Sequence, residues 1–354
     1  MNNILKYGSI ADIPLYNCSA HTPAHTPEEW SEKDGVVRPI VGCLDMAYGI
    51  FVNIMYIPIL TVMFETDHFK MSCFKIMIFL GIVDMMALWV NSIITGYLAF
   101  HGAVYCSYPR LIYIAGMAGL GLWCCSCIIA MSLVINRLMD LTRPVLCARI
   151  FSGNKTFLVM TIPVIYGLYF VFFTAPVMFS SKYMTWFFDP LIFPDRGSEV
   201  SLIHIFGMCY MFLLQYANIP HGFNNLLVVG VTCLLYTSLC CVLGEKFNMI
   251  EDTSHSKTKN LSLQIFFQSA LICAINQIAS IIYVIMNFIE VPLWLIMLGH
   301  VLWQFGHGAP VLIYLALNRT LRNGLLRRLG FRKIRIGSYN AERGSVNPTK
   351  TGHT

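Results

Sequence analysis

Long runs of apolar residues alternate with short polar segments along this chain of 354 residues. Seven runs reach the ~20 residues that an α-helix needs to cross the hydrocarbon core of a bilayer. They lack the apolar–polar alternation, in segments of ~10 residues, that transmembrane β-strands require. The pattern therefore predicts an all-α membrane protein with a seven-transmembrane helix bundle. The expected spans cover residues 40–64, 76–100, 111–138, 157–179, 222–244, 261–289 and 292–317.

The composition supports the same class. Hydrophobic residues make up 56% of the chain and charged residues only 12%, and the mean hydropathy is +0.64. A soluble domain carries about 25% charged residues, so an ordinary soluble domain is excluded. The first 30 residues contain no short apolar segment of the signal-peptide type, and we expect the first membrane helix to direct insertion.

An eighth apolar stretch at residues 200–214 complicates the count. As a helix its 15 residues extend only about 22 Å, less than the ~30 Å core. Lys and Arg favour the cytoplasmic side. With seven spans and the N-terminus outside, 18 of the 24 basic residues lie inside, nine of them after the last span. An eighth span would place those nine outside, so seven spans are predicted. Basic cytoplasmic segments also explain the net charge of +6 without nucleic-acid binding.

The eighth stretch is then expected to be a re-entrant or surface segment of the second extracellular loop. A second hypothesis is that residues 200–215 are a retained intron, because the dipeptides at its ends can be encoded by splice-site consensus bases. A mature transcript that includes these codons would exclude the intron.

Polar side chains share one face of the second span, where Asp84, Asn91 and Thr95 are spaced at i, i+7 and i+11. An unpaired carboxylate at membrane depth costs about 2.5–3.5 kcal/mol. We therefore expect Asp84 to have partners, and the candidates are Asn53 in the first span and the Tyr314–Asn318 end of the last.

The last two spans also carry polar stripes. For any single amide or hydroxyl, the simplest interpretation is an interhelical hydrogen bond. Two histidines without a third ligand do not indicate a metal site. The stripes consist of His300, Gln304, His307, Tyr314 and Asn318 in the seventh span, and of Asn276, Ser280, Tyr283 and Asn287 in the sixth.

Small residues crowd the third span, including Gly116, Gly119, Gly121 and the Cys124–Cys127 pair, and they favour close helix packing over a redox or zinc site. Trp123 lies ~21 Å along the helix from the charged end of this span, a depth that suits core packing or the floor of an outward-facing pocket. The sequence contains no P-loop, nucleophile elbow or HExxH motif, so we expect no enzymatic activity and no cofactor.

Three of the 13 cysteines are expected on the outer side: Cys18, Cys106 and Cys209. The extracellular side is oxidising, and Cys18–Cys106 is the preferred disulfide, with Cys106–Cys209 as the alternative. Asn17 belongs to an Asn-Cys-Ser sequon on the same side and is a candidate glycosylation site.

The segment after the last span alternates leucine with arginine and is expected to form a basic amphipathic helix along the inner membrane surface. Residues 337–354 are polar and are predicted to be disordered. The expected organisation is an extracellular tail (1–39), the helix-bundle domain (40–318) and a cytoplasmic tail (319–354).

Several motifs, taken together, resemble the nematode chemoreceptors called serpentine receptor class T. They are YNCS (16–19), FKIMIFLGIVD (74–84), GYLAFHGAVYC (96–106), INRLMDL (135–141), IPHGFNN (219–225) and WQFGHGAPVLIYLALNRTLR (303–322). The resemblance covers residues 16–330, interrupted at about 197–215. It implies a G-protein-coupled receptor in the plasma membrane of sensory neurons, with sensory cilia as a candidate location. Such a receptor binds a small molecule outside and engages the α-subunit of a heterotrimeric G protein inside.

The resemblance to rhodopsin-like receptors in general implies a signalling switch at the inner end of the third span. Asn136-Arg137 takes the place of the Asp-Arg pair, so Arg137 matches the switch arginine. Asp140, at i+3, is a candidate acidic partner. The alternative role for Arg137 is to snorkel at the membrane interface.

The same resemblance extends to the polar core. Asp84 and Asn53 match the polar residues of the second and first helices. Pro310 and Tyr314 are similar to an Asn-Pro-x-x-Tyr motif, although the Asn is absent and one extra residue precedes Tyr314. The proline pivot of the sixth span is also absent.

A ligand pocket is expected to open outward among the second, third, sixth and seventh spans. No clear acid faces it, unless Asp45 or Glu290 near the outer rim does, so a small neutral odorant is the hypothesis. The alternatives are a transporter or channel, although the inverted repeats typical of transporters are missing, or a non-signalling membrane scaffold. The candidate pocket residues are Trp89, Tyr97, Trp123, Asn276, His300 and Gln304.

Overall fold

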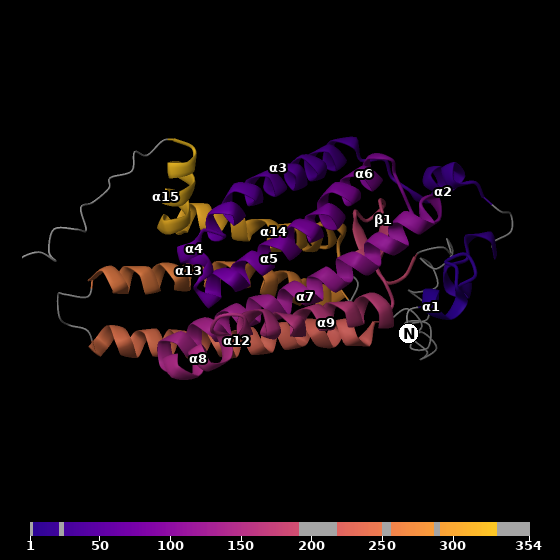
Figure 1. Cartoon of the computed structure of the whole chain (residues 1–354). Coiled ribbons are helices and arrows are strands. Elements are labelled where there is room, and N and C mark those ends of the chain that lie inside the picture. The colour runs from indigo at the N-terminus through magenta and orange to yellow at the C-terminus, as the bar shows by residue number, and fades with distance from the viewer. Residues whose placement is uncertain (1–2, 21–24, 191–217, 250–255, 287–290, 331–354) are drawn as a thin grey trace, which may run out of the picture.

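The computed structural model describes residues 3–20, 25–190, 218–249, 256–286 and 291–330. Seven long helical segments lie alongside one another in an elongated bundle (Figure 1). Along the described residues, six of them are long and apolar enough to cross a membrane, and the sixth in chain order contributes a shorter apolar stretch, Leu271–Met286. The bundle confirms the predicted fold class. Its helices are α3 (Pro39–Met63), α5 (Ser72–Leu88) with its continuation, α7 (Pro109–Thr142), α9 (Lys155–Phe173), α12 (Ile219–Met249), α13 (Ser256–Met286) and α14 (Leu293–Leu317).

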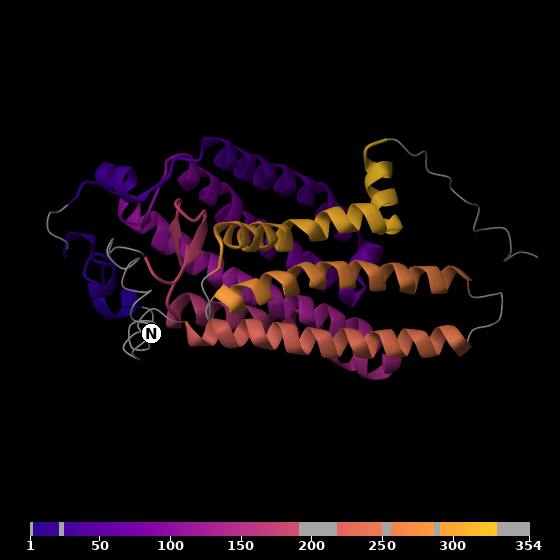
Figure 2. The same cartoon turned by 180° about the vertical axis from the view of Figure 1, so that it is seen from behind.

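The two ends of the bundle carry different small elements (Figures 1 and 2). One end, called the hairpin end below, holds a two-stranded sheet and the N-terminal elements α1 (Asn3–Tyr7), η1 (Pro14–Tyr16), η2 (Cys18–Ala20) and α2 (Pro27–Asp34). The other, called the α15 end, holds α4 (Thr66–Phe69), α8 (Pro144–Phe151) and α15 (Arg319–Arg328). The amphipathic helix expected after the seventh span is therefore α15.

The second span is interrupted by a π-helical turn. After α5 the chain continues as η3 (Trp89–Ile94) and then as α6 (Thr95–Phe100). A π turn holds one more residue than an α turn and is often found at functional sites. Here it turns Asn91 and Ser92 into the core, where both are fully buried, and the Thr95 hydroxyl donates back to the Val90 carbonyl oxygen at 2.8 Å.

The fourth span is shorter than predicted. The apolar run suggested a helix to residue 179, but α9 ends at Phe173 and Thr174 is extended (φ −121°, ψ 166°). The following residues form a hairpin in which β1 (Met178–Ser180) pairs antiparallel with β2 (Thr185–Phe187). The apolar residues that resembled helix serve instead to bury the hairpin, since Phe179 is only 1% exposed.

The helix α7 packs tightly on its neighbours through glycine, as the sequence predicted. A Cβ on Gly121 would collide with the Val171 side chain and lie 2.9 Å from the Gly167 carbonyl oxygen on α9. A Cβ on Gly116 would overlap the Val177 carbonyl oxygen just before the hairpin. These contacts place α7 against both α9 and β1. The stretch 200–214, Cys209 and the tail 337–354 lie outside the described residues.

Candidate functional site

A buried carboxylate stands at the junction of three helices. Asp84, on α5, is 1% exposed. Its Oδ1 lies 2.8 Å from His307 Nδ1 on α14, and its Oδ2 accepts from the Tyr56 hydroxyl on α3 at 3.0 Å. The same hydroxyl is 2.8 Å from the His307 carbonyl oxygen, so its single hydrogen is shared between two acceptors. Asp84 thus fastens α3, α5 and α14 together.

The partners expected for Asp84 from the sequence were wrong. The Asn53 side chain donates to the Gly49 carbonyl oxygen of its own helix at 2.8 Å. The Tyr314 hydroxyl is buried and has no hydrogen-bond partner among the described residues, and Asn318 Oδ1 caps the start of α15. Pro310 is buried inside α14. The sequence did contain signals for the true partners. His307 belongs to the polar stripe of α14, and Tyr56 follows Asn53 by three residues, but spacing along single helices does not show which helices meet.

Trp123 connects this network to the fifth long helix. The indole is 4% exposed, and its Nε1–H donates to Asn225 Oδ1 on α12 at 3.1 Å. Its ring meets the His307 ring edge-on at 5.9 Å between centroids. Asn276 lies close by on α13, since both it and Trp123 approach Gly306 of α14. Asn225 was not predicted as a functional residue, although it closes the IPHGFNN motif.

A second polar group lies nearer the hairpin end. Gln304 Nε2 donates to the Asn91 carbonyl oxygen at 2.8 Å and lies 3.1 Å from His300 Nε2. Asn91 Nδ2 is 3.5 Å from the Trp303 carbonyl oxygen. Because α14 advances one turn between His300 and Gln304 and another to His307, these side chains follow one face of the helix.

Two of the six candidate pocket residues lie apart from the other four. Trp89 is 57% exposed and Tyr97 is 40% exposed. The π turn that directs Asn91 inward leaves Trp89 on the outer surface of the bundle. Tyr97 contacts the rings of His101 and Tyr108 at the hairpin end.

Arg137 lies near the α15 end of α7 and is half-buried. It has no carboxylate within 4 Å among the described residues, and Asp140 is exposed. The Cys73 thiol of α5 lies beside its guanidinium. The expected i+3 pairing with Asp140 is therefore absent from the described part of the chain.

Asn136, the neighbour of Arg137, tethers α7 to two other helices. It is 1% exposed, and its Nδ2 donates to Ser72 Oγ of α5 at 3.0 Å and to Cys147 Sγ of α8 at 3.5 Å. The Cys147 thiol in turn donates to the Asn136 carbonyl oxygen at 3.6 Å. Burial raises the pKa of the Cys147 thiol. An acid here would place a charge in this buried position, so the asparagine is suited to holding the helices together.

Two further contacts at the α15 end were not predicted, because Lys75, Arg327 and Arg328 entered the prediction only as cytoplasmic charges. Lys75 is 7% exposed, and its ammonium donates to the Gly153 carbonyl oxygen at 2.7 Å. Glu65 forms ion pairs with Arg327 at 3.0 Å and Arg328 at 3.1 Å. These bonds fix the loop after α8 and the end of α15 to the bundle.

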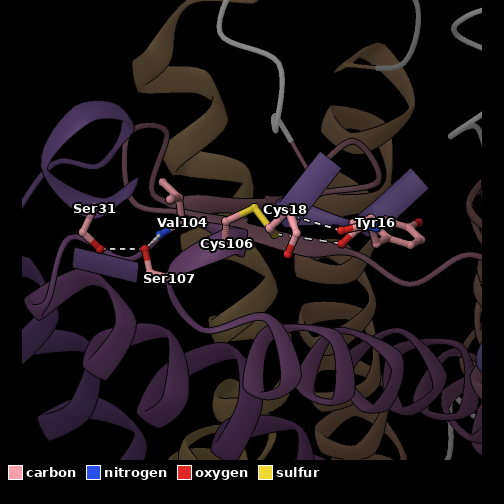
Figure 3. The surroundings of a disulfide bond; sticks show 8 residues. Tyr16, Cys18, Ser31, Val104, Cys106 and Ser107 are labelled. Carbon is pink, nitrogen blue, oxygen red and sulfur yellow. Dashed lines mark hydrogen bonds between the residues drawn. A yellow bond between two sulfur atoms is a disulfide. The ribbon is translucent and has the colours of Figure 1, made fainter. Parts of the chain in front are cut away.

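The hairpin end is closed by the N-terminal segment. Figure 3 shows the Cys18–Cys106 disulfide, the preferred pairing, which joins this segment to the turn before α7. Beside it, the hydroxyl oxygens of Ser31 and Ser107 are 2.6 Å apart. Asn17 Oδ1 accepts from the Ser19 backbone N–H at 2.9 Å. The tail is therefore a folded cap.

The hairpin reaches from the cap into the bundle. Trp186 of β2 is 3% exposed, and its indole N–H donates to the Thr95 hydroxyl at 2.9 Å. Thr95 is the residue that closes the π turn onto Val90. The sequence placed Thr95 on a polar face but gave no signal for its partner, which lies 91 residues later.

Seven apolar helices around a buried polar junction define a multi-pass membrane protein with a seven-transmembrane bundle. A family model described as Serpentine type 7TM GPCR chemoreceptor Srt matches residues 3–338. The chain belongs to this family of chemoreceptors, which confirms the resemblance read from the motifs. It is also similar to Serpentine receptor class T-55 of Caenorhabditis elegans, with 27% identity over 316 residues that cover 89% of this chain and 80% of the relative.

Proposed function

We propose that the protein is a chemosensory receptor that binds a small ligand near the hairpin end and signals through the α-subunit of a heterotrimeric G protein at the α15 end. The observation that carries the proposal is Arg137, a half-buried arginine near the end of α7 that has no acidic partner among the described residues. A planar guanidinium with five donors suits backbone carbonyl groups of an incoming peptide.

The surroundings of Arg137 support a docking role. Asn136 holds α7 to α5 and α8, so the guanidinium projects from a fixed base. The neighbouring helix α8 exposes an apolar residue, with Val145 84% exposed. Arginine is among the residues enriched at protein interfaces.

We further propose that the hairpin end faces the extracellular space. The basic residues of the sequence favour the α15 end as the cytoplasmic side, and a disulfide is stable in an oxidising compartment. In this orientation Asn17 is accessible to glycosylation. Trp123, Asn276, His300 and Gln304 lie on the inward faces of α7, α13 and α14, and we assign the ligand pocket to them. The plasma membrane, and sensory cilia in particular, is the proposed location.

The proposal is tested by replacing Arg137 with Ala in the full-length receptor. Cells that express wild type and variant at matched surface levels are screened with small odorants, and second-messenger output is recorded. We expect Arg137→Ala to lose at least tenfold in signalling, whereas Arg110→Ala, which removes an exposed arginine at the hairpin end, leaves it unchanged. Equal output from wild type and Arg137→Ala would refute the switch role.

A further inference from the structure

A second carboxyl group is buried in the hairpin-end half of the bundle. Asp45 lies on α3, six residues after Pro39 and so about 9 Å along the helix from its start. It is 9% exposed. Its backbone carbonyl oxygen accepts from the Ser92 hydroxyl at 2.5 Å, but its Oδ2 is buried without a hydrogen-bond partner among the described residues. In this it differs from Asp84, whose two oxygens are both bonded.

The groups around Asp45 are neutral and polar. The Gln304 side chain lies beside its carboxyl. Gln304 Nε2 also donates to the Asn91 carbonyl oxygen, and Asn91 Oδ1 is a second buried acceptor without a partner in the described chain. Gln304 of α14 therefore contacts both Asp45 of α3 and Asn91 of the π turn, and each of these two residues has one buried oxygen without a partner among the described residues.

No described basic side chain neutralises Asp45. His300 Nε2 lies 3.1 Å from the Gln304 amide nitrogen, which is a donor, so this ring nitrogen is assigned as an acceptor and the imidazole as neutral. Arg38, one residue before α3, is engaged with the hairpin: it donates to the Ser181 and Lys182 carbonyl oxygens, each at 3.0 Å. Buried carboxylates are normally paired, and Asp45 has no ion-pair partner among the described residues.

We propose that Asp45, Asn91 and Gln304 form a binding site for the ammonium group of a small primary amine. This inference rests on the proposed receptor function and makes short-chain amines its ligand class, in place of the neutral odorant expected from the sequence. An ammonium group carries three donors and no acceptor, so two of its hydrogens can bond the unpartnered oxygens of Asp45 and Asn91. The amine must be small, because Asp45 is only 9% exposed within the packed helices.

The opposing interpretation is that Asp45 is a structural residue. The stability of the receptor without ligand distinguishes the two interpretations. A binding site for a cation carries an uncompensated group that destabilises the unliganded protein, whereas a structural residue stabilises it. We therefore compare the thermal unfolding of the full-length receptor in nanodiscs with that of Asp45→Asn, which keeps the shape and removes the charge. The expected result is a melting temperature equal to or above wild type. A lower melting temperature would identify Asp45 as structural and overturn the proposal. Asp12→Asn is the control at an exposed site of the hairpin end.

The ligand class is tested on the same samples with butylamine, which is protonated at neutral pH, and with 1-butanol as its uncharged analogue. A ligand that binds only the folded state raises the melting temperature with concentration. We expect butylamine to stabilise wild type, with at least a tenfold weaker effective affinity for Asp45→Asn, and 1-butanol to stabilise neither. An equal shift in both proteins, an equal effect of the alcohol, or no effect of butylamine would each overturn the site.

These measurements contain no G protein, so they separate the site from the proposed function. If butylamine stabilises the receptor through Asp45 but produces no second-messenger response, the site stands and the signalling proposal fails. If the receptor signals in response to neutral odorants with wild-type potency in Asp45→Asn and does not bind butylamine, the signalling proposal stands and the site fails.

Discussion

The pairing of His307 with Asp84 leads to a quantitative stability prediction: His307→Leu should destabilise the bundle by about 3 kcal/mol. Both side chains are 1% exposed, and the Oδ1–Nδ1 distance is 2.8 Å. Removing one partner of a buried pair costs about 3–5 kcal/mol, since the remaining group stays buried without compensation. Tyr56 continues to donate to Asp84 Oδ2, which places the expected loss at the lower limit.

The second part of this prediction concerns the double variant. Replacing both members of a buried pair by uncharged groups is often close to neutral. We therefore expect Asp84→Asn combined with His307→Leu to be more stable than His307→Leu alone. The coupling energy from the double-mutant cycle should exceed about 1.5 kcal/mol, within the range of residues in direct contact.

The assay is thermal unfolding of the full-length receptor in nanodiscs, followed with a thiol-reactive fluorophore at one scan rate. Buried free cysteines such as Cys73, Cys124 and Cys127 supply the signal when the bundle opens. At roughly 2 °C per kcal/mol, His307→Leu should melt about 6 °C below wild type, and His101→Leu, an exposed histidine, should not. Wild-type melting of His307→Leu, or strictly additive losses in the double variant, would contradict the reasoning.

Two further predictions concern the tether and the cap. Burial raises the pKa of the Cys147 thiol, and the thiolate is the reactive form, so Cys147 should react slowly with maleimide at neutral pH. Asn136→Ala should increase the rate of this reaction several-fold, as measured by mass spectrometry. An unchanged rate would argue against the contact between Asn136 and Cys147. The Cys18–Cys106 bond closes 88 residues of chain, so Cys18→Ser should lose about 2–4 kcal/mol of stability. A mutant that melts like the oxidised wild type would show that the cap is held without the disulfide.

The sequence predicted the helices well because a segment inside a bilayer must satisfy its backbone polar groups internally, and a helix does this. A long apolar run in a membrane protein therefore indicates a helix. The sequence could not distinguish apolar residues that pack a hairpin against the bundle from those that extend a span, since Met178 and Phe179 are apolar in either role. The predicted end of the fourth span therefore lies six residues beyond the end of α9.

The candidate site was predicted less completely than the fold. Helical spacing placed Asp84 and His307 on inward faces but could not bring them together, because the rotation of α14 against α5 is a property of packing. The π turn had no sequence signal at all, and it decides that Asn91 is buried while Trp89 is exposed. Arg137 stays a prediction from position and resemblance, and the structure adds that Asn136 anchors the residue beside it.

The cap imposes an order on synthesis. Val36 N–H donates to Ser181 Oγ and Arg38 donates to the Ser181 carbonyl oxygen, both at 3.0 Å, across more than 140 residues of chain. The N-terminal segment leaves the ribosome first, yet its docking surface is complete only after the fourth helix has been inserted. In the proposed orientation, Asn17 is therefore accessible to the glycosylation machinery in the lumen before Cys106 has been synthesised and the Cys18–Cys106 disulfide can form.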